Sequence, residues 1–567
     1  MVKFKHALVI VMALSLALSA CTSGQTTAAP ANTQAPGETS APLPTEETHE
    51  PVILRFGWLN EVDTLNPAYA FFSTSYAVFD LVYSSLVKEG LDGKYYGDLA
   101  ASWSESDDHL TWTFTLKDNV KWHNGEPLTA GDLAWCINEI IGDPEGWATL
   151  VNYTNGFKEV TAPDDKTVQI TLEYPIPNMD YRVSFLYAFY RPDYEPLTTL
   201  EDLQNFQNEN LIGTGAFKLN KFDKDNAVVV LDSNPDFYDG RPIIDGVIFQ
   251  KFDNSDALVQ ALKVGDIDAL TGVPNSAYET VKTFDNVEAV NAPGRSFDEL
   301  IVNSAPLDRD PTPAGNPALQ DPQVRLAIAH ALNKQDLVDI VYQGLAQPEW
   351  SIVSPRLTAG FWHDANIKDQ EFDLAKANQI LDEAGYVKEA DGVRAKEGVR
   401  LELRLQYDTD SPEYARDADL IAGWLGEVGI KATPEAMDYN TLVERTTGVG
   451  DFDLVIWGWG GDPDPDFILS IMLCDQFEVG GWSDSGYCNP EYDELYLAQQ
   501  QAATPEERQK IILKMQELLF RDKPYIVLYN YDDLYAYRSD RFTNFQLDTP
   551  NPYIADVLAL LNVEPVK

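Results

Sequence analysis

Positive charge, histidine and cysteine are all scarce in this chain of 567 residues. Its 41 Lys and Arg residues stand against 90 Asp and Glu residues, which gives a formal net charge of −49 at neutral pH. A field of that sign repels phosphate backbones, so nucleic acid is not expected as a partner. The excess acid fits either a solvated surface that keeps a protein soluble or the attraction of cationic ligands.

Sequence motifs for common kinds of catalysis are also missing. The six histidines form no His-Glu-x-x-His pattern, and neither a Gly-x-Ser-x-Gly turn nor a phosphate-binding loop is present. These absences argue against a zinc protease, an α/β-hydrolase and a nucleotide hydrolase. We predict a protein that is not an enzyme and has no cofactor. The enzyme alternative is a secreted glycosidase, with two carboxylates flanking the scissile bond.

Long apolar runs are absent beyond the N-terminus. There, Lys3 and Lys5 precede an apolar run at 7–18. The run is shorter than the roughly 20 residues that span a bilayer, and it fits a secretory signal at 1–20. Leu18-Ser19-Ala20-Cys21 resembles the lipobox of bacterial lipoproteins. This implies lipidation of Cys21 and an extracytoplasmic protein anchored to the bacterial cell membrane. An ordinary signal peptide cut near Ala20 is the alternative.

The residues after Cys21 differ in composition from the rest. The segment 22–50 is rich in Thr, Ala, Pro and Glu and has few large apolar side chains. Such a segment cannot bury enough surface to offset its ordering entropy, so we predict a disordered linker with a reach of roughly 30 Å. The remainder, 51–567, is long enough for two or three domains.

Three further cysteines follow the proposed anchor. Cys474 and Cys488 flank a Gly-rich stretch. In an extracytoplasmic protein a disulfide between them is expected, and it would contribute about 3 kcal/mol of stability. Cys136 is then predicted to be a free thiol, buried on a helix.

Strand-like and helix-like segments alternate along the chain, which predicts an α/β architecture. Helix starts are marked by cap residues, of which Asp373, Thr504 and Thr129 are the clearest. They predict helices over 374–384, from 505 to about 521, and from 130 onward. The predicted strands are 53–58, 111–116, 168–172, 227–231, 300–303, 401–407, 452–457 and 525–529.

Three motifs resemble the peptide/nickel-type (family 5) extracellular solute-binding proteins of ABC importers, which include oligopeptide- and dipeptide-binding lipoproteins. The first is WTFTLK at 112–117 with VKWHNGEPLTA at 120–130. The second is DPQVRLAI at 321–328 with ALNK at 331–334. The third is GWGGDPDPD at 458–466 with CNPEY at 488–492. Their order along the chain, behind a lipoprotein-like signal, strengthens the resemblance.

The resemblance implies a two-lobed fold of the periplasmic-binding-protein (Venus-flytrap) type, with a two-segment hinge and an inserted subdomain in lobe I. Hinge strands are expected at 295–303 and 525–530. The implied divisions are 51–91, 213–291 and 526–567 for lobe I, 92–212 for the insertion and 292–525 for lobe II.

The ligand site is expected where the strand ending in Trp457-Gly458-Trp459-Gly460-Gly461 gives way to alternating Asp and Pro. Glycines allow close backbone approach, so an extended peptide could add to this strand as a further strand. The resemblance assigns the α-ammonium group of the peptide to Asp462 and places Trp459 beside the ligand. The alternatives are a turn role for Asp462 and a core role for Trp457 or Trp459.

The opposing wall is expected in lobe I. The resemblance places Phe72, Ser73 and Thr74 near the ligand backbone, and helix capping by Ser73 or Thr74 is the alternative. Dipeptide-binding members hold the ligand carboxylate with an Arg in the segment that corresponds to 405–412. Here that segment carries Asp408 and no Arg. Oligopeptide-binding members use an Arg where this chain has Ile456, so capture of a carboxylate is unaccounted for.

These features predict a monomer that binds a small peptide between its lobes and delivers it to the membrane subunits of an ABC permease. Closure of the lobes around the ligand is expected to favour docking on the permease. An oligosaccharide is the alternative ligand, and a nickel- or haem-binding member of the same family is a further alternative. The acids at 462, 464 and 466 share the spacing of a calcium loop, but its Gly and final Glu are missing, so no metal is predicted.

Overall fold

The computed structural model describes residues 50–147, 149–309, 313–409, 411–447, 449–478 and 481–566. The predicted signal, Cys21 and nearly all of the predicted linker lie outside the described residues. The chain divides into two units, 1–50 and 51–567, and only the second is treated below. In the part of the chain that is described, no helix combines the length and apolar character needed to cross a membrane.

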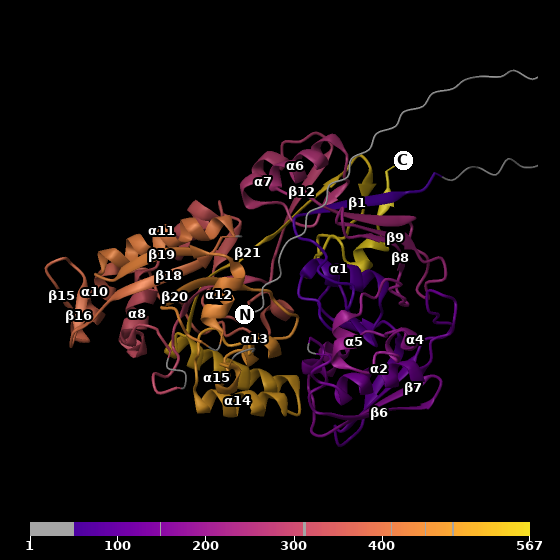
Figure 1. Cartoon of the computed structure of the whole chain (residues 1–567), viewed down its shortest axis with the longest axis horizontal. Coiled ribbons are helices and arrows are strands. Elements are labelled where there is room, and N and C mark those ends of the chain that lie inside the picture. Colours follow the sequence, from indigo (N-terminus) through magenta and orange to yellow (C-terminus); the bar gives the residue numbers. More distant parts are fainter. Residues whose placement is uncertain are drawn as a thin grey trace, which may run out of the picture. The chain divides into compact units, whose positions relative to one another are not determined.

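Two large sheets organise the second unit (Figure 1). The strands of the first sheet lie in the order β12-β22-β11-β1-β10-β9-β8. At its centre β1 pairs in parallel with β10 and with β11, and alternate β1 residues, Leu54 and Phe56, are fully buried. The bounds are β12 Val287–Ala292, β22 Asp533–Arg538, β11 Ala269–Leu270, β1 Ile53–Trp58, β10 Gly246–Lys251, β9 Val228–Ser233 and β8 Phe217–Asp223.

The second sheet has the order β14-β21-β13-β20-β18-β19. Each of its faces is covered by an apolar core, one built around Leu454 and Ile456 and the other around Val455. Successive residues of one strand therefore serve opposite cores, as the twofold alternation of a strand requires. The bounds are β14 Ala346–Pro348, β21 Tyr525–Tyr531, β13 Phe297–Val302, β20 Leu454–Trp459, β18 Glu402–Asp408 and β19 Lys431–Met437.

The predicted insertion carries its own sheet, in the order β4-β5-β7-β6. Helix α2 (Ala130–Gly142) packs on β6 and β7, and Phe114 of β5 and Leu133 of α2 belong to the same core as Leu54 of the first sheet. The insertion and the first sheet are thus consolidated by one core. The bounds are β4 Ala100–Glu105, β5 Thr111–Leu116, β7 Thr167–Leu172 and β6 Phe157–Asp164.

The helix starts predicted from cap residues are confirmed. The Asp373 side chain accepts the Lys376 N–H at the start of α10, and the Thr504 side chain accepts the Glu507 N–H at the start of α15. At α2 a capping box joins Thr129 and Asp132. The bounds of α10 and α15 are Leu374–Glu383 and Pro505–Asp522, and the other α-helices are α1 Ser73–Val82, α3 Met179–Ser184, α4 Arg191–Tyr194, α5 Leu200–Asn205, α6 Ser255–Val264, α7 Asn275–Val281, α8 Pro322–Ala331, α9 Lys334–Asp336, α11 Pro412–Glu427, α12 Tyr439–Thr446, α13 Asp466–Ser470, α14 Pro490–Gln500 and α16 Val557–Leu560.

Short strands and one disulfide complete the unit. Cys474 and Cys488 are joined by a disulfide, and Cys136 is a buried free thiol on α2. The short strands are β2 Val87–Glu89 with β3 Tyr95–Gly97, β15 Val387–Lys388 with β16 Arg394–Lys396 and β17 Val399–Arg400, and β23 Phe542–Thr543 with β24 Glu564–Pro565.

The chain passes between the two large sheets twice. It leaves the first sheet after β12 and enters the second at β13, and it returns from β21 to β22 through Asp532. The strands β13 and β21 are antiparallel neighbours within the second sheet. The crossing residues are therefore 293–296 and 532, and the boundary predicted at 526 falls inside β21.

Candidate functional site

Strand β20, which was expected to present an edge to the ligand, lies inside the second sheet. It pairs along its whole length with β13, from Leu454 opposite Val302 to Trp459 opposite Phe297. On its other side it pairs with β18 only at Leu454 and Val455. Among the described residues, the stretch from Ile456 to Trp459 therefore has a strand partner on one side only. The accessible edge is confined to this half of β20.

The two tryptophans of β20 lie on one face of the second sheet and pack against the same core. Trp457 stacks on Tyr439 with ring centroids 5.3 Å apart, and Trp459 meets Phe467 edge-on at 5.9 Å. Both indoles are half-buried. The Trp459 side chain also reaches the buried Asp484 and Tyr525, where its hydrogen bonding opposes the rise in pKa that burial causes in both groups. Trp459 therefore combines a core contact with a polar contact to this buried pair.

The three glycines differ in what surrounds them. A Cβ on Gly458 would lie 2.2 Å from Asp298 Oδ1, and one on Gly461 would lie 2.3 Å from Arg295 Cβ. A Cβ on Gly460 would meet nothing within 4 Å. Gly458 and Gly461 are thus required by packing within the chain, whereas Gly460 borders open space that a ligand backbone could enter.

Asp462 ends this segment and is reached from the insertion. Its Oδ2 accepts a hydrogen bond from the Tyr181 hydroxyl at 3.0 Å. Burial raises the pKa of Asp462 to about 6, the Tyr181 hydrogen bond opposes this shift, and the charge of Asp464 adds to it. A half-buried carboxyl group that is mostly ionised at neutral pH is suited to receive a cationic group.

Aromatic residues that sequence reasoning missed lie around Asp462. Burial raises the pKa of Tyr181 and of Tyr153 well above its usual value, and in both residues the Asp462 charge raises it further. The Asp462 charge also reaches Tyr76 on α1. The rings of Tyr153 and Tyr181 meet edge-on at 5.8 Å. No motif marks these tyrosines, because they come from three separate segments of an aromatic-rich chain.

The predicted residues of the opposing wall serve mixed roles. Phe72 occupies the N-cap position of α1 and is 45% exposed, and neither Ser73 nor Thr74 caps the helix. The capping alternative is therefore wrong. The buried Thr74 hydroxyl instead donates to the Glu61 carbonyl, while Ser73 is exposed. Phe72 and Ser73 remain available to a ligand.

Asp408 lies at the end of β18, close to the tryptophan wall. It is buried and accepts the Ser411 N–H at 3.1 Å. Its charge raises the pKa of Tyr439 after the larger effect of burial, and Tyr439 stacks on Trp457. Asp408, Tyr439 and Trp457 thus form a group on the side of β20 opposite β13.

Arginines near the site are paired with acids of the chain. Arg295 Nη2 lies 2.6 Å from Glu89 Oε1, and Arg356 Nη2 lies 2.7 Å from Asp532 Oδ1. The capture of a ligand carboxylate, which the sequence left unaccounted for, therefore gains no candidate from either residue.

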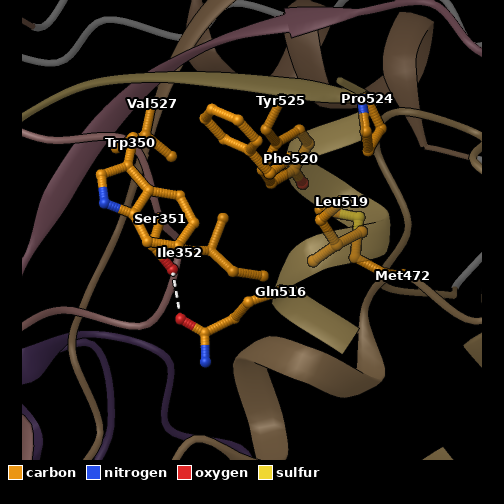
Figure 2. Close-up of a pocket in the computed structure, with 10 residues that line it drawn as sticks. All are labelled: Trp350, Ser351, Ile352, Met472, Gln516, Leu519, Phe520, Pro524, Tyr525 and Val527. Atoms are coloured by element: carbon orange, nitrogen blue, oxygen red, sulfur yellow. Dashed lines mark hydrogen bonds between the residues drawn. The ribbon is translucent and has the colours of Figure 1, made fainter. Parts of the chain in front are cut away.

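The structure has two cavities in this region, of which one touches the segment after Asp462 and the other lies away from the site. One of about 140 Å³ is lined by Asp80, Lys88 and Tyr187 among others, and by Pro463, which follows Asp462. A second, of about 20 Å³, lies between β21 and α15 and has the Ser351–Gln516 hydrogen bond in its wall (Figure 2). It has room for about one water, and none of the predicted site residues lines it.

Comparison with known proteins identifies the family to which the chain belongs. The family model of the bacterial extracellular solute-binding proteins, family 5 Middle, matches residues 94–478, well over half of the chain. The chain belongs to this family. The prediction from the three motifs is confirmed. As predicted, the matched relatives are named as binding proteins, one of them from Brucella ovis as a putative ABC transporter peptide-binding protein, and not as enzymes.

The family 5 protein matches its relatives over nearly full length. It is 25% identical over 553 residues to the dipeptide-binding protein DppE of Bacillus subtilis, covering 93% of both chains. It is 26% identical over 528 residues to the oligopeptide-binding protein AppA of the same organism, covering 92% of both.

Solved structures of the family share the fold. NikZ from Campylobacter jejuni, in complex with Ni(L-His), gives a TM-score of 0.78 at 23% identity over 90% of this chain and 99% of that one. AppA from B. subtilis, in complex with a nonapeptide, gives 0.75 at 22% identity over 91% and 100%. The predicted α/β, two-lobed fold is thereby confirmed.

Proposed function

We propose that this family 5 protein captures oligopeptides outside the cytoplasm and delivers them to an ABC permease, tethered through a lipid on Cys21. The observation that carries the proposal is the singly paired half of β20, which leads through Gly460 to the half-buried carboxylate of Asp462. A peptide backbone pairs with such an edge irrespective of sequence, and its ammonium group then meets Asp462.

The relatives support a peptide as the ligand. DppE and AppA are named as dipeptide- and oligopeptide-binding proteins, and the AppA structure holds a nonapeptide. The paired state of Arg295 and Arg356 favours a peptide held by its backbone and ammonium group over one clamped by its carboxylate. Phe72, Ser73 and the Asp408–Tyr439–Trp457 group would border the bound chain.

Mass spectrometry of the molecules that co-purify with the mature chain tests this function. Release by mild denaturation is expected to give a mixture of short peptides of restricted length. A single oligosaccharide or a nickel complex would overturn the peptide proposal while leaving the family and the fold intact. If nothing is released, calorimetric titration with a pool of synthetic peptides two to nine residues long is the second test.

Gly460→Ala is expected to weaken peptide binding by at least about tenfold without lowering stability, because its Cβ meets only open space in the chain but would obstruct a ligand backbone. Gly423→Ala, in α11 and equally unobstructed, is the matched control and should leave affinity unchanged. Calorimetric titration and thermal unfolding check both variants. Unchanged affinity in Gly460→Ala would place the ligand backbone elsewhere.

A further inference from the structure

The three acids at positions 462, 464 and 466, which follow β20, contact the short helix α3 of the insertion and its N-cap residue. Asn178 Nδ2 donates to Asp464 Oδ1 at 3.3 Å, the Tyr181 hydroxyl donates to Asp462, and Arg182 Nη2 lies 3.5 Å from Asp466 Oδ2. Positions 178, 181 and 182 lie together because residues three and four apart share a face of a helix. Pro463 and Pro465 separate the acids and restrict the backbone between them.

On the side of the insertion, the contact residue Arg182 is held in place by other residues of the insertion. Arg182 is 2% exposed, its Nε donates to Asn178 Oδ1 at 3.2 Å, and its Nη1 donates to the Asn155 carbonyl at 2.6 Å. These hydrogen bonds orient the guanidinium group without any contribution from the second-sheet side of the contact. Arg182 therefore projects one preorganised positive charge.

The other half is organised within the second-sheet lobe, the part of the chain from β13 to β21 that contains the second sheet. Arg508 binds Asp464 with both terminal nitrogens, and Arg508 Nε donates to Gln499 Oε1 at 2.7 Å. Gln499 Nε2 in turn donates to Asp466 Oδ1 at 2.7 Å. Arg508 is 1% exposed, so this cluster is buried. It holds two carboxylates and one guanidinium, which leaves one negative charge to be balanced.

We infer that residues 178–182 and 462–466 form a latch between the lobes, in which Arg182 positions the Asp462 segment for the ligand. Contact between the halves balances the charges of Asp464 and Asp466 with those of Arg508 and Arg182. Separation leaves Arg508 as the single cation for two acids and takes Arg182, 2% exposed in the closed contact, away from its acidic partner at 3.5 Å. The charges are therefore balanced within a low-dielectric contact only when the halves meet. Asp464 and Asp466 serve closure, and Asp462 alone is left for the ligand.

The role of the latch in ligand affinity rests on the proposed function, but its role in closure does not. Few contacts join two preorganised halves, so little ordering cost opposes closure. Closure should therefore be populated in the ligand-free chain and should set how long a ligand stays bound.

The test is a distance measurement between spin labels on the full chain, at Lys158→Cys in the insertion and Ala390→Cys in the second-sheet lobe. Both positions are exposed. Arg182→Gln and Asp466→Asn are each expected to lower the ligand-free closed population at least fivefold. The double variant should do no more than either single variant, because both remove the same interaction. Ligand dissociation should be faster in each of these three variants than in the wild-type chain, and by a similar factor.

Arg191→Gln is the matched control, since Arg191 pairs with Glu195 within the insertion at 2.6 Å. It should leave the distance distribution unchanged. Unchanged distances in both Arg182→Gln and Asp466→Asn, or additive effects in the double variant, would overturn the latch. If Arg182→Gln disturbs the insertion, as hydrogen exchange of α2 would reveal, Asp466→Asn decides. If the wild-type chain binds no peptide, the proposed function fails, while the ligand-free distances still judge the latch.

Discussion

Raising the pH from about 5 to 8 is expected to lower the free energy of unfolding by at least about 5 kcal/mol. Burial raises the pKa of Asp298 and of Asp484 to about 7 and that of Asp417 to about 8. Burial also raises the pKa of Glu299 well above its usual value. In this window the folded chain keeps protons that the unfolded chain has released. Stability therefore falls as the pH rises.

The surroundings of Asp298 and Asp417 explain these shifts. Tyr342 and Tyr414 donate to Asp298 at 2.9 and 3.2 Å, and Tyr529 donates to Asp417 at 2.7 Å. The hydroxyl groups reduce the cost of ionisation but supply no positive charge. The fold thus favours neutral carboxyl groups beside the second sheet.

Asp417→Asn should raise the free energy of unfolding by on the order of 3 kcal/mol more at pH 8 than at pH 5. The amide oxygen can still accept from Tyr529, while the proton no longer has to leave. Urea unfolding at several pH values measures the effect. Asp225→Asn, at an exposed position, is the control. A stability that rises from pH 5 to 8, or an Asp417→Asn variant with an unchanged slope, would contradict this account.

Asp462→Asn should weaken the binding of a peptide with a free N-terminus by about 100-fold, because a buried charge pair of this kind is worth a few kcal/mol. The acetylated analogue, which binds more weakly from the start, should lose little. Calorimetric titration of both peptides against both proteins isolates the ammonium contribution as a double-mutant cycle. Equal losses for the two peptides would remove this role from Asp462.

The same residue predicts the pH dependence of affinity. The pKa of Asp462 is raised to about 6 in the ligand-free chain, and a bound ammonium group favours the ionised carboxylate. Affinity should therefore fall by up to tenfold per unit below about pH 6, and it should fall again above about pH 8, where the peptide ammonium group loses its proton. Asp462→Asn should flatten the fall below pH 6, and an acid-side fall that persists in the variant would assign that titration to another group.

Local patterns predicted local structure well. The caps at Asp373, Thr504 and Thr129 mark helix starts because each acts on N–H groups within one turn. The alternation of Trp457 and Trp459 with glycine places both indoles on one face for the same reason. Such features depend on neighbours in the sequence and need no knowledge of the fold.

Features that depend on distant residues could not be predicted. The interior position of β20 follows from the strand order β13-β20-β18, which no local pattern encodes. Asn178 and Asp464 are 286 positions apart, so the partner of the Asp-Pro repeat was not evident. The buried acids Asp298 and Glu299 lie within a segment predicted as a hinge strand. Their surroundings include Tyr342 and Asp484, which are distant in the sequence, so their burial could not be predicted locally.

The close approach of Gly461 to Arg295 has a mechanical consequence. Arg295 lies in the first crossing between the sheets, and β13, which follows it, is bonded along its full length to β20. In the proposed function, a ligand on β20 and Gly460 would act close to the two crossings about which the lobes are expected to turn. A small displacement near such a pivot would become a large one at the far ends of two rigid arms. Occupancy of a small site would then produce a movement that a partner could sense at the outer surfaces.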